Sequence, residues 1–325
     1  MRRRDFITLV GGVTAAWPLA ARAQTIPIIG FLAQGTQDEG AALLSAVRKG
    51  LGEANLIEGK DFTSEFRWAH NDAVRLPGLA AELVQRRVAI IVVLDTQTAA
   101  RAAKLATNKI PIVFSFGADP VKAGLVESLN RPGGNITGIS TMSLDLGTKW
   151  VGLLHELLPS ARRFAVLVNI ETADAARSLI TSVQEGALPT GLQTEIVFAS
   201  TASELEPAFA GLGARAQALI VHPDVLFLRN REPLAALAIS EKLATISTVQ
   251  GFAQAGGLLS YGSDFVEAHH QAGLYVARIL KGEKPGDSPV QRATKFNLVI
   301  NLKTAKAIGL NIPAMFQARA DEVIE

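Results

Sequence analysis

The sequence predicts an α/β protein built from two doubly wound lobes, each with a parallel sheet at its centre. Three observations lead to this prediction. Short apolar runs alternate with segments of helical spacing along most of the 325 residues, and 48% of the residues are hydrophobic. The alternation restarts after an amphipathic helix expected at 146–158. About 300 residues also exceed the size at which one hydrophobic core keeps growing.

The first block of this pattern predicts five strands and two helices. The runs at 88–94 and 110–114 are continuously apolar, as expected for parallel strands that are buried on both faces. Strands are also expected at 26–32, 62–68 and 136–140, and helices at 42–51 and 76–84. A turn rich in glycine and asparagine at 130–135 precedes the last of these strands.

The second block follows the helix at 146–158, which Pro159 closes. Strands are expected at 164–168, 194–198, 218–221, 258–261 and 296–300, and helices at 173–184, 203–212 and 266–280. We expect three crossings between the lobes, near 140–146, near 261–265 and in the Gly/Pro-rich stretch 282–289. The predicted lobes are then 24–141 with about 262–290, and 142–261 with about 291–325.

The first 23 residues are expected to form a cleaved export signal of the twin-arginine type. A basic start with paired arginines leads into an apolar run at 6–20, and Ala21-Arg22-Ala23 then supplies a cleavage site. The run is shorter than the ~20 residues that cross a bilayer. The mature chain is therefore expected to begin near Gln24, most simply in a periplasm, by the twin-arginine or the general secretory route.

Charge and cysteine content exclude several classes of function. The chain has 32 Lys and Arg against 30 Asp and Glu; without the leader's four arginines and one aspartate, 28 remain against 29. This balance does not favour nucleic acid or a membrane surface as a partner. The absence of cysteine excludes disulfides, thiolate metal sites and thiol nucleophiles.

Candidate binding residues follow the predicted strands, because ligands of open parallel sheets bind beyond the carboxyl ends of the strands. These loops hold hydroxyl, amide and carboxylate groups but almost no cations, which favours a small ligand with donors and acceptors over a phosphorylated one. The candidates in the first lobe are Gln34, Thr36, Thr96, Ser115, Phe116 and Asp119. Those in the second are Asn169, Thr172, Asp224, Tyr261 and Asp264.

Each candidate also has an ordinary structural interpretation. Asp119 precedes a proline and is typical of a helix N-cap, and Asp224 could serve in the same way. Thr96, Ser115 and Thr172 are likewise typical capping residues. The functional interpretation depends on their recurrence at one topological position in both lobes.

Motifs of common enzymes are missing from the sequence. It contains no G-x-x-x-x-G-K-[ST], H-E-x-x-H or G-x-S-x-G. The match to G-x-G-x-x-A at 211–216 ends a predicted helix, where a C-cap is expected. His269 and His270 are neighbours and face different directions on a helix, so they do not indicate a metal site. We therefore expect no cofactor, no metal and no catalysis.

Long segments of the chain resemble the bacterial family of ABC-transporter substrate-binding proteins related to the tryptophan/tyrosine-binding type. The leader matches in RRDFITL at 3–9 and WPLAARAQ at 17–24. Further matches are IPIVF at 110–114, DPV at 119–121, SLNRPGGNITG at 128–138, LHELLP at 154–159, AGGL at 255–258, ILKGEKP at 279–285 and FNLVINLKTAK at 296–306. The resemblance covers essentially the whole chain.

The resemblance implies the type I periplasmic-binding-protein fold, with three crossings and a ligand enclosed between the lobes. It implies a monomer that captures a small polar or amphipathic solute, such as an amino acid, and delivers it to an ABC permease in the inner membrane. A ligand-sensing subunit for a membrane receptor is the alternative. The loops at 94–97 and 169–172 depart from the family pattern. The resemblance therefore supports the fold and the role in transport more strongly than the identity of the ligand.

If the ligand is an amino acid, the candidates divide by chemistry. Hydroxyls of the first lobe, from Thr96 and Ser115 foremost, are expected to hold the carboxylate. Asp224 or Asp264 of the second lobe is expected to pair with the ammonium. An aromatic ring is expected to cover the ligand's side chain, and the two candidates are Phe116 and Tyr261.

Overall fold

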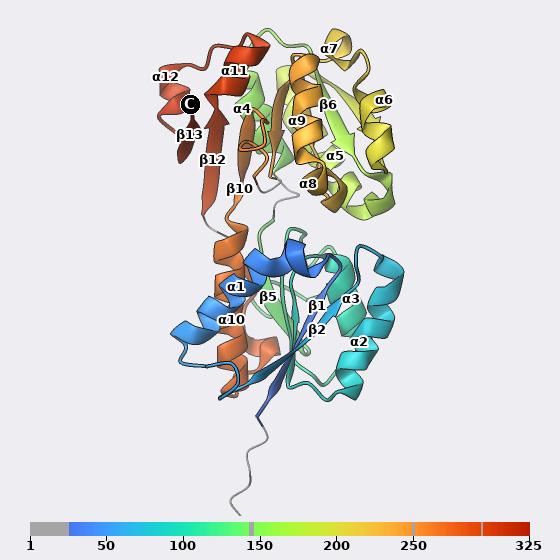
Figure 1. Ribbon diagram of the computed structural model, residues 1–325, viewed down its shortest axis with the longest axis vertical. Coiled ribbons are helices and arrows are strands. Elements are labelled where there is room, and N and C mark those ends of the chain that lie inside the picture. The colour runs from blue at the N-terminus through green and yellow to red at the C-terminus, as the bar shows by residue number, and fades with distance from the viewer. Residues whose placement is uncertain (1–25, 143–145, 249–250, 294) are drawn as a thin grey trace, which may run out of the picture.

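The computed structural model describes residues 26–142, 146–248, 251–293 and 295–325. Figure 1 shows two lobes stacked along the long axis, each with helices on both faces of a central sheet. This arrangement confirms the predicted fold class. The predicted export signal lies outside the described residues, and no helix within those ranges is both long enough and apolar enough to cross a membrane.

Lobe 1 is built on a six-stranded sheet in the order β11-β5-β4-β3-β1-β2, and every neighbouring pair is parallel. Its strands are β1 (Ile28–Ala33), β2 (Thr63–Trp68), β3 (Ile90–Val93), β4 (Ile112–Phe116), β5 (Ile136–Ser140) and β11 (Gln291–Arg292). Its helices are α1 (Gln37–Glu53), α2 (Leu76–Gln85), α3 (Gln97–Ala106) and α10 (Phe265–Leu280), with 3-10 turns at η1 (Ala73–Arg75) and η6 (Pro285–Asp287).

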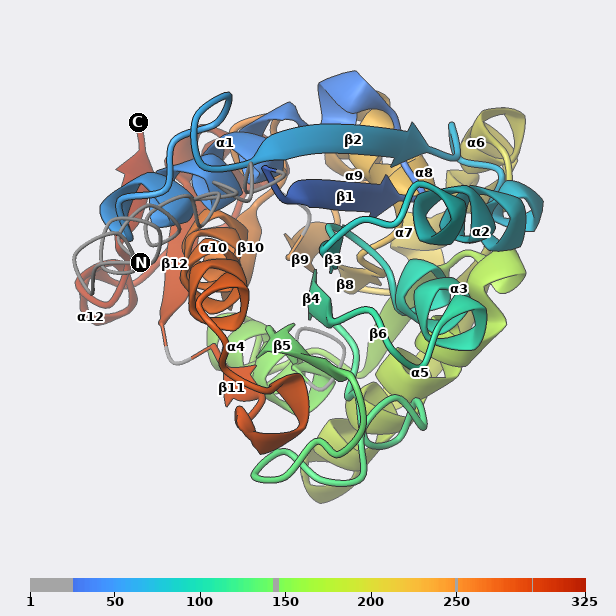
Figure 2. The same ribbon diagram turned by 90° about the horizontal axis from the view of Figure 1, so that it is seen from below.

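The helices of lobe 1 cover its sheet in two pairs, as Figure 2 shows. Apolar side chains of α2 and α3 form one core with the sheet, and those of α1 and α10 form another on the opposite face. Two glycines let α1 and α10 approach closely. A Cβ at Gly50 would lie 2.2 Å from the His270 carbonyl oxygen, and one at Gly273 would lie 2.3 Å from that of Val47.

Lobe 2 is built on a seven-stranded sheet in the order β13-β12-β10-β9-β8-β6-β7. Its strands are β6 (Arg163–Val168), β7 (Gln193–Phe198), β8 (Ala218–Val221), β9 (Ala244–Ser247), β10 (Leu259–Ser263), β12 (Phe296–Asn301) and β13 (Glu322–Ile324). Its longer helices are α4 (Gly147–Leu157), α5 (Ala173–Ala187) and α9 (Arg231–Ser240). The shorter ones are α6 (Leu205–Phe209), α7 (Leu212–Arg215), α8 (Val225–Arg229), α11 (Leu302–Ile308), α12 (Ala314–Gln317), η3 (Ile170–Thr172), η4 (Leu188–Thr190) and η5 (Ala202–Glu204).

One pair of strands in lobe 2 runs antiparallel, between β10 and β12. β10 leaves the lobe at its carboxyl end, whereas β12 enters the lobe from the same boundary, so two neighbours there must run in opposite directions. The other pairs of this sheet are parallel. Apolar side chains of α4 and α5 cover one face of the sheet, and those of α6, α7, α8 and α9 cover the other.

The chain crosses between the lobes three times, from β5 to α4, from β10 to α10 and from β11 to β12. The Ser263 hydroxyl donates to the Thr141 carbonyl at 2.8 Å and ties the first two crossings together. The prediction that the stretch 282–289 is a crossing is wrong. This stretch stays on lobe 1, because the Thr137 hydroxyl of β5 donates to the Ser288 carbonyl at 2.7 Å and Val290 N–H donates to Leu129.

Candidate functional site

The carboxyl edges of the two sheets face each other across the boundary between the lobes. β5 and β10 both leave their lobes through their carboxyl ends, so the crossings lie at these edges. All the parallel strands of a sheet end on the same side. The loops after β1 and β3 of lobe 1 are therefore turned toward those after β6, β8 and β9 of lobe 2.

Three of the predicted residues gather in lobe 1, in the loops after β1 and β3. The Thr96 hydroxyl donates to Gln34 Oε1 at 3.2 Å and also caps α3 by accepting from Ala99 N–H. Thr36 caps α1 in a reciprocal pair with Glu39, whose Oε2 accepts from Thr36 N–H at 2.7 Å. Thr96 therefore has its predicted capping role and also lies at the interlobe edge. Thr36 does both as well, although no cap was predicted there.

Asp95 belongs to this lobe 1 group, although the sequence reasoning did not select it. Its Oδ2 accepts from Gly35 N–H at 2.9 Å, whereas its buried Oδ1 has no hydrogen-bond partner among the described residues. Burial raises the pKa of Asp95 to about 6, and hydrogen bonds from Gly35, Gln34 and Thr96 offset part of that effect. Its position directly after an apolar strand was the available signal.

Three predicted residues also form a group in lobe 2, in which Asn169 and Thr172 contact Asp224. The Asn169 amide donates to Asp224 Oδ1 at 3.0 Å, and the Thr172 hydroxyl donates to Oδ2 at 2.9 Å. Leu226 N–H also donates to Oδ1 at 2.8 Å, so Asp224 is the N-cap of α8. Both carboxylate oxygens are thus already bound within lobe 2.

Two further polar side chains of this edge, His222 and Thr248, were missed by the sequence reasoning. Both ring nitrogens of His222 and the Thr248 hydroxyl are buried without a hydrogen-bond partner among the described residues. Burial lowers the pKa of His222 to about 4, while the negative charge of Asp224 acts in the opposite direction. A polar residue directly after the apolar strand β8 was the signal that could have found His222. β9 reads Ala-Thr-Ile-Ser, so the pattern gave no such signal for Thr248.

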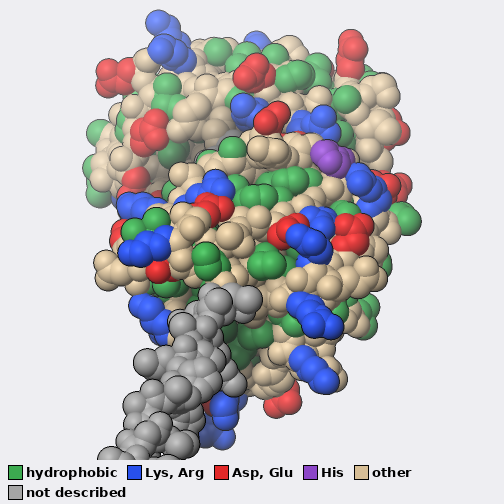
Figure 3. All heavy atoms as spheres, turned by 60° about the horizontal axis from the view of Figure 1, so that its bottom comes forward, with side chains coloured by type: hydrophobic (Ala, Val, Ile, Leu, Met, Phe, Trp, Pro, Cys, Tyr) green, Lys and Arg blue, Asp and Glu red, His purple; other side chains and the backbone are tan. Residues whose placement is uncertain are grey.

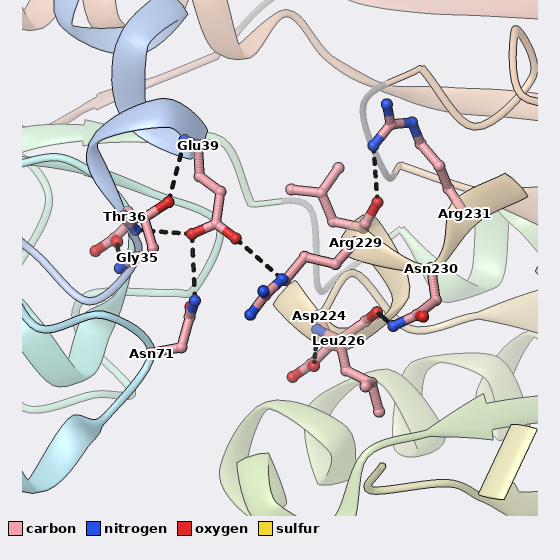
Figure 4. A network of polar contacts seen from close by, with 11 residues as sticks. Gly35, Thr36, Glu39, Asn71, Asp224, Leu226, Arg229, Asn230 and Arg231 are labelled. Carbon is pink, nitrogen blue, oxygen red and sulfur yellow. Dashed lines mark hydrogen bonds and ion pairs between the residues drawn. The ribbon is translucent and has the colours of Figure 1, made fainter. Parts of the chain in front are cut away.

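One ion pair joins the two facing edges, as Figure 4 shows. Arg229 Nε at the end of α8 lies 3.4 Å from Glu39 Oε1 in the first turn of α1. Asn71 also donates to Glu39, at 3.3 Å. Burial acts to raise the pKa of Glu39, but the hydrogen bonds from Thr36 and Asn71 and the charge of Arg229 together lower it. Glu39 is therefore an anion held at the boundary between the lobes.

Two lobe 1 candidates lie inside a strand rather than beyond one. β4 runs to Phe116, two residues further than predicted, and successive side chains of a strand point to opposite faces. Ser115 is therefore covered by α10, with its hydroxyl 3.4 Å from His269 Nδ1. Phe116 stacks on Phe114 in the opposite core, with ring centroids 4.5 Å apart. Neither side chain joins the interlobe group.

The remaining candidates also lie apart from the two groups. Tyr261 is inside β10 and stacks on Phe296 of β12, and burial raises its pKa. Asp264 caps α10 by accepting from Glu267 N–H at 3.0 Å. Asp119 accepts from the N–H groups of Val121 and Lys122 in a turn. These three are placed by packing and capping.

A cavity of about 340 Å³ lies beside the crossings. Its polar lining includes Asp264, Glu267, Gln271, Gln291, Arg292 and Lys295, so it belongs to the start of α10 and the region around β11. Within the described ranges, no cluster of His, Asp or Glu side chains is suited to hold a metal ion. On the face shown in Figure 3, cationic and anionic side chains are interspersed, and neither charge forms a separate patch.

Comparisons with known proteins agree with the fold and identify the family. Residues 26–324 match the family model described as ABC transporter substrate binding protein. A tyrosine-binding protein of Clostridioides difficile (strain R20291) is 29% identical over 263 residues, which are 81% of this chain and 75% of the relative.

Two solved structures share the fold over 92% of this chain and 99% of their own. A conserved domain protein of Vibrio cholerae has a TM-score of 0.83 at 26% identity. An ABC domain from Streptococcus pneumonia in complex with L-Trp has a TM-score of 0.82 at 23% identity. With the family match covering nearly all of the described chain, the protein belongs to the family of ABC transporter substrate binding proteins.

Proposed function

We propose that this protein is the periplasmic component of an ABC importer and that it captures an amino acid between its two lobes. The names of similar proteins support this ligand class, since one relative is a tyrosine-binding protein and one structural neighbour holds L-Trp. The alternative of a ligand-sensing subunit is not favoured by the family match. Export through a cleaved leader, and a monomer that docks on an inner-membrane permease, are part of the proposal.

The observation that carries the proposal is the polar edge on each lobe. Gln34, Thr36 and Thr96 follow strands of lobe 1, while Asn169, Thr172 and Asp224 follow strands of lobe 2. Hydroxyls and helix N-termini suit a ligand carboxylate. Asp95 suits a ligand ammonium, because Oδ1 is the carboxylate oxygen without a hydrogen-bond partner among the described residues at these two edges.

Capture would proceed by lobe closure about the three crossings. A ligand first held by one lobe gains contacts from the other lobe when the lobes close. It shifts the equilibrium only by its extra affinity for the closed form. The contact between Glu39 and Arg229 is the kind of interlobe interaction that contributes to the closed form.

A thermal-shift screen of the purified protein tests the proposal. The protein is unfolded and refolded to remove bound ligand and is then mixed with amino acids, small carboxylates, nucleosides and sugars. A ligand at 100 times its Kd adds about 2.7 kcal/mol of stability, which raises Tm by several degrees. A response confined to amino acids supports the proposal, and a response confined to another class overturns the ligand assignment.

A further inference from the structure

His269 is a buried histidine of α10 that the proposed function does not use. It is 1% exposed and lies between α10 and the carboxyl ends of β3 and β4. Its Nε2 lies 2.5 Å from the Leu94 carbonyl oxygen, while Nδ1 lies 2.7 Å from the Phe265 carbonyl oxygen and 3.4 Å from the Ser115 hydroxyl. The imidazole therefore joins the first turn of α10 to the residue that follows β3.

The partners of the ring decide which nitrogen carries the proton. Only an imidazolium could donate to both carbonyls, and burial lowers the pKa of His269, which favours the neutral ring. The Phe265 carbonyl already accepts the His269 backbone N–H within the helix, and the Ser115 hydroxyl can donate to Nδ1. The remaining N–H belongs on Nε2, so the hydrogen bond to Leu94 is present in either protonation state.

The Leu94 carbonyl directly precedes two residues of the lobe 1 edge, Asp95 and Thr96. This carbonyl and the Asp95 nitrogen belong to one planar peptide unit, so a bond to the oxygen sets where the Asp95 backbone lies. Asp95 Oδ2 accepts from Gly35 N–H at 2.9 Å, and the Thr96 hydroxyl donates to the neighbouring residue of the same loop at 3.2 Å. Those bonds tie the loop after β3 to the loop after β1, whereas His269 ties it to α10.

α10 gives this bond a fixed origin. Asp264 caps its first turn by accepting from Glu267 N–H at 3.0 Å. The helix also packs closely on α1, because a Cβ at Gly273 would lie only 2.3 Å from the Val47 carbonyl oxygen. Groups carried by a rigid element hold a site more precisely than groups carried by loops. His269 therefore anchors a loop of the site to a helix that is itself held in place.

We propose that His269 is a positioning residue of the ligand site, which holds Asp95 and Thr96 in place through the Leu94 carbonyl. This inference rests on the proposed function, in which an amino acid meets those two side chains. Ser115 contributes through His269, because its hydroxyl orients the imidazole. The residue that the sequence predicted as a ligand contact thus acts without touching the ligand.

Substitutions at His269 separate its two nitrogens. Glutamine can place an amide N–H where Nε2 lies, asparagine places its amide near Nδ1, and leucine donates to neither carbonyl. We expect His269→Leu and His269→Asn to weaken amino-acid binding about tenfold, whereas His269→Gln stays within about threefold of the unmodified protein. Calorimetry measures the affinity for the standard amino acid that gives the largest thermal shift, with L-tyrosine and L-tryptophan tested first.

Thr137→Val is the matched control. Thr137 is buried in β5 of lobe 1, and its hydroxyl donates to the Ser288 carbonyl at 2.7 Å. The substitution removes a comparable bond from a side chain to the backbone, but one that does not hold the loop after β3. It should lower Tm and leave the affinity unchanged, which separates the role of His269 from a general weakening of lobe 1.

The carboxyl group of Asp95 reports on its own position without any ligand. Burial raises its pKa to about 6, and NMR titration of the ligand-free protein measures this value. Release of the Leu94 carbonyl in His269→Leu should admit water to the carboxyl group and lower its pKa toward the ordinary 3.8. His269→Gln should leave the pKa unchanged.

The outcomes separate this inference from the proposed function. Weaker binding and a lowered Asp95 pKa in His269→Leu, with both restored in His269→Gln, support the inference. Unchanged affinity in His269→Leu, or an equal loss in Thr137→Val, overturns the inference and leaves the proposed function intact. If no standard amino acid binds the unmodified protein, the proposed function is wrong and the Asp95 titration alone decides the positioning role. If His269→Leu does not fold, the contrast between His269→Gln and His269→Asn provides the test.

Discussion

Arg229 Nε lies 3.4 Å from Glu39 Oε1, and this ion pair links the end of α8 in lobe 2 to the first turn of α1 in lobe 1. The two residues belong to different folded units, so their contact depends on the relative position of the lobes. The Arg229 side chain is 58% exposed, and exposed ion pairs of this kind contribute only ~0.2–1 kcal/mol. That small energy acts directly on the equilibrium between open and closed forms.

Replacing Arg229 by methionine should weaken ligand binding about two- to fivefold at low salt, with little change in Tm. Methionine keeps the apolar stem but removes the charge, so the closed form loses one interlobe contact. Added salt should reduce the difference from the unmodified protein. Arg86→Met is the matched control, because Arg86 is 57% exposed and pairs with Glu65 inside lobe 1. Equal effects of the two substitutions would contradict an interlobe role.

Replacing Asp224 by alanine should lower the free energy of unfolding by about 2–3 kcal/mol. The substitution removes the N-cap of α8 and leaves the Asn169 amide without its acceptor. The Thr172 hydroxyl loses Asp224 but keeps the Asn169 carbonyl oxygen, at 3.1 Å. Urea unfolding measures the loss. Asp119→Ala is the control substitution. In the contacts described above, Asp119 accepts hydrogen bonds from two backbone N–H groups and from no side chain. If both substitutions cost the same, the side-chain network around Asp224 adds no stability.

Replacing Gly50 by alanine should destabilise lobe 1 by about 3 kcal/mol or more, because the added Cβ would lie 2.2 Å from the His270 carbonyl oxygen of α10. Gly52 lies in the same helix, and a Cβ there meets nothing within 4 Å. Gly52→Ala should therefore stabilise the protein by about 0.5–1 kcal/mol through helix propensity. Thermal unfolding of both variants measures the contrast, and a harmless Gly50→Ala would show that α1 and α10 can separate at low cost.

The hydrophobic pattern predicted both lobes, because buried parallel strands form continuous apolar runs and the long helices are amphipathic. It missed the strands β9 and β13 and the helices α3, α8, α9, α11 and α12. Most of these elements are too short to show a clear periodicity, and α3 and α9 are ten-residue helices in which alanine supplies much of the apolar face. The helix expected at 203–212 is divided, because Gly211 adopts a left-handed conformation at φ 67° and separates α6 from α7. A two-residue strand such as β11 has no periodicity to detect, and the last crossing was misplaced for that reason.

The topological rule for ligand loops located Gln34, Thr36 and Thr96 in lobe 1 and Asn169 and Thr172 with Asp224 in lobe 2. It placed Ser115 and Tyr261 at an edge because β4 and β10 each extend two residues beyond the predicted end. Whether a polar side chain keeps an atom without a hydrogen bond depends on residues far away in the sequence. A local sequence pattern does not show which of those residues will lie beside it. Asp95, His222 and Thr248 were missed on that account.

Stability should depend on pH through Asp95, and the sign follows from its raised pKa. The carboxyl group ionises near its ordinary value of 3.8 in the unfolded chain and at about 6 in the folded protein. Between these values the folded form binds more protons, so this contribution to stability decreases as pH rises from about 4 to about 6. Asp95→Asn removes the contribution and should weaken binding of an amino acid if Asp95 pairs with its ammonium. Urea unfolding from pH 4 to pH 8 measures the first effect, and calorimetry at pH 7 measures the second.

His222 should produce the opposite trend in nearly the same pH range. Its pKa falls from 6.5 to about 4 on folding, so the unfolded chain binds more protons between these values and stability rises with pH. In the unmodified protein this rise largely cancels the fall that is due to Asp95. Each substitution is therefore compared with the unmodified protein, because burial also lowers the pKa of His269, which adds its own rise with pH in every variant. Asp95→Asn should make stability rise more steeply between pH 4 and pH 6, and His222→Gln should make it rise less steeply between pH 4 and pH 6.5. If stability changed with pH in the same way in both variants, Asp95 and His222 would not both be buried in their neutral forms.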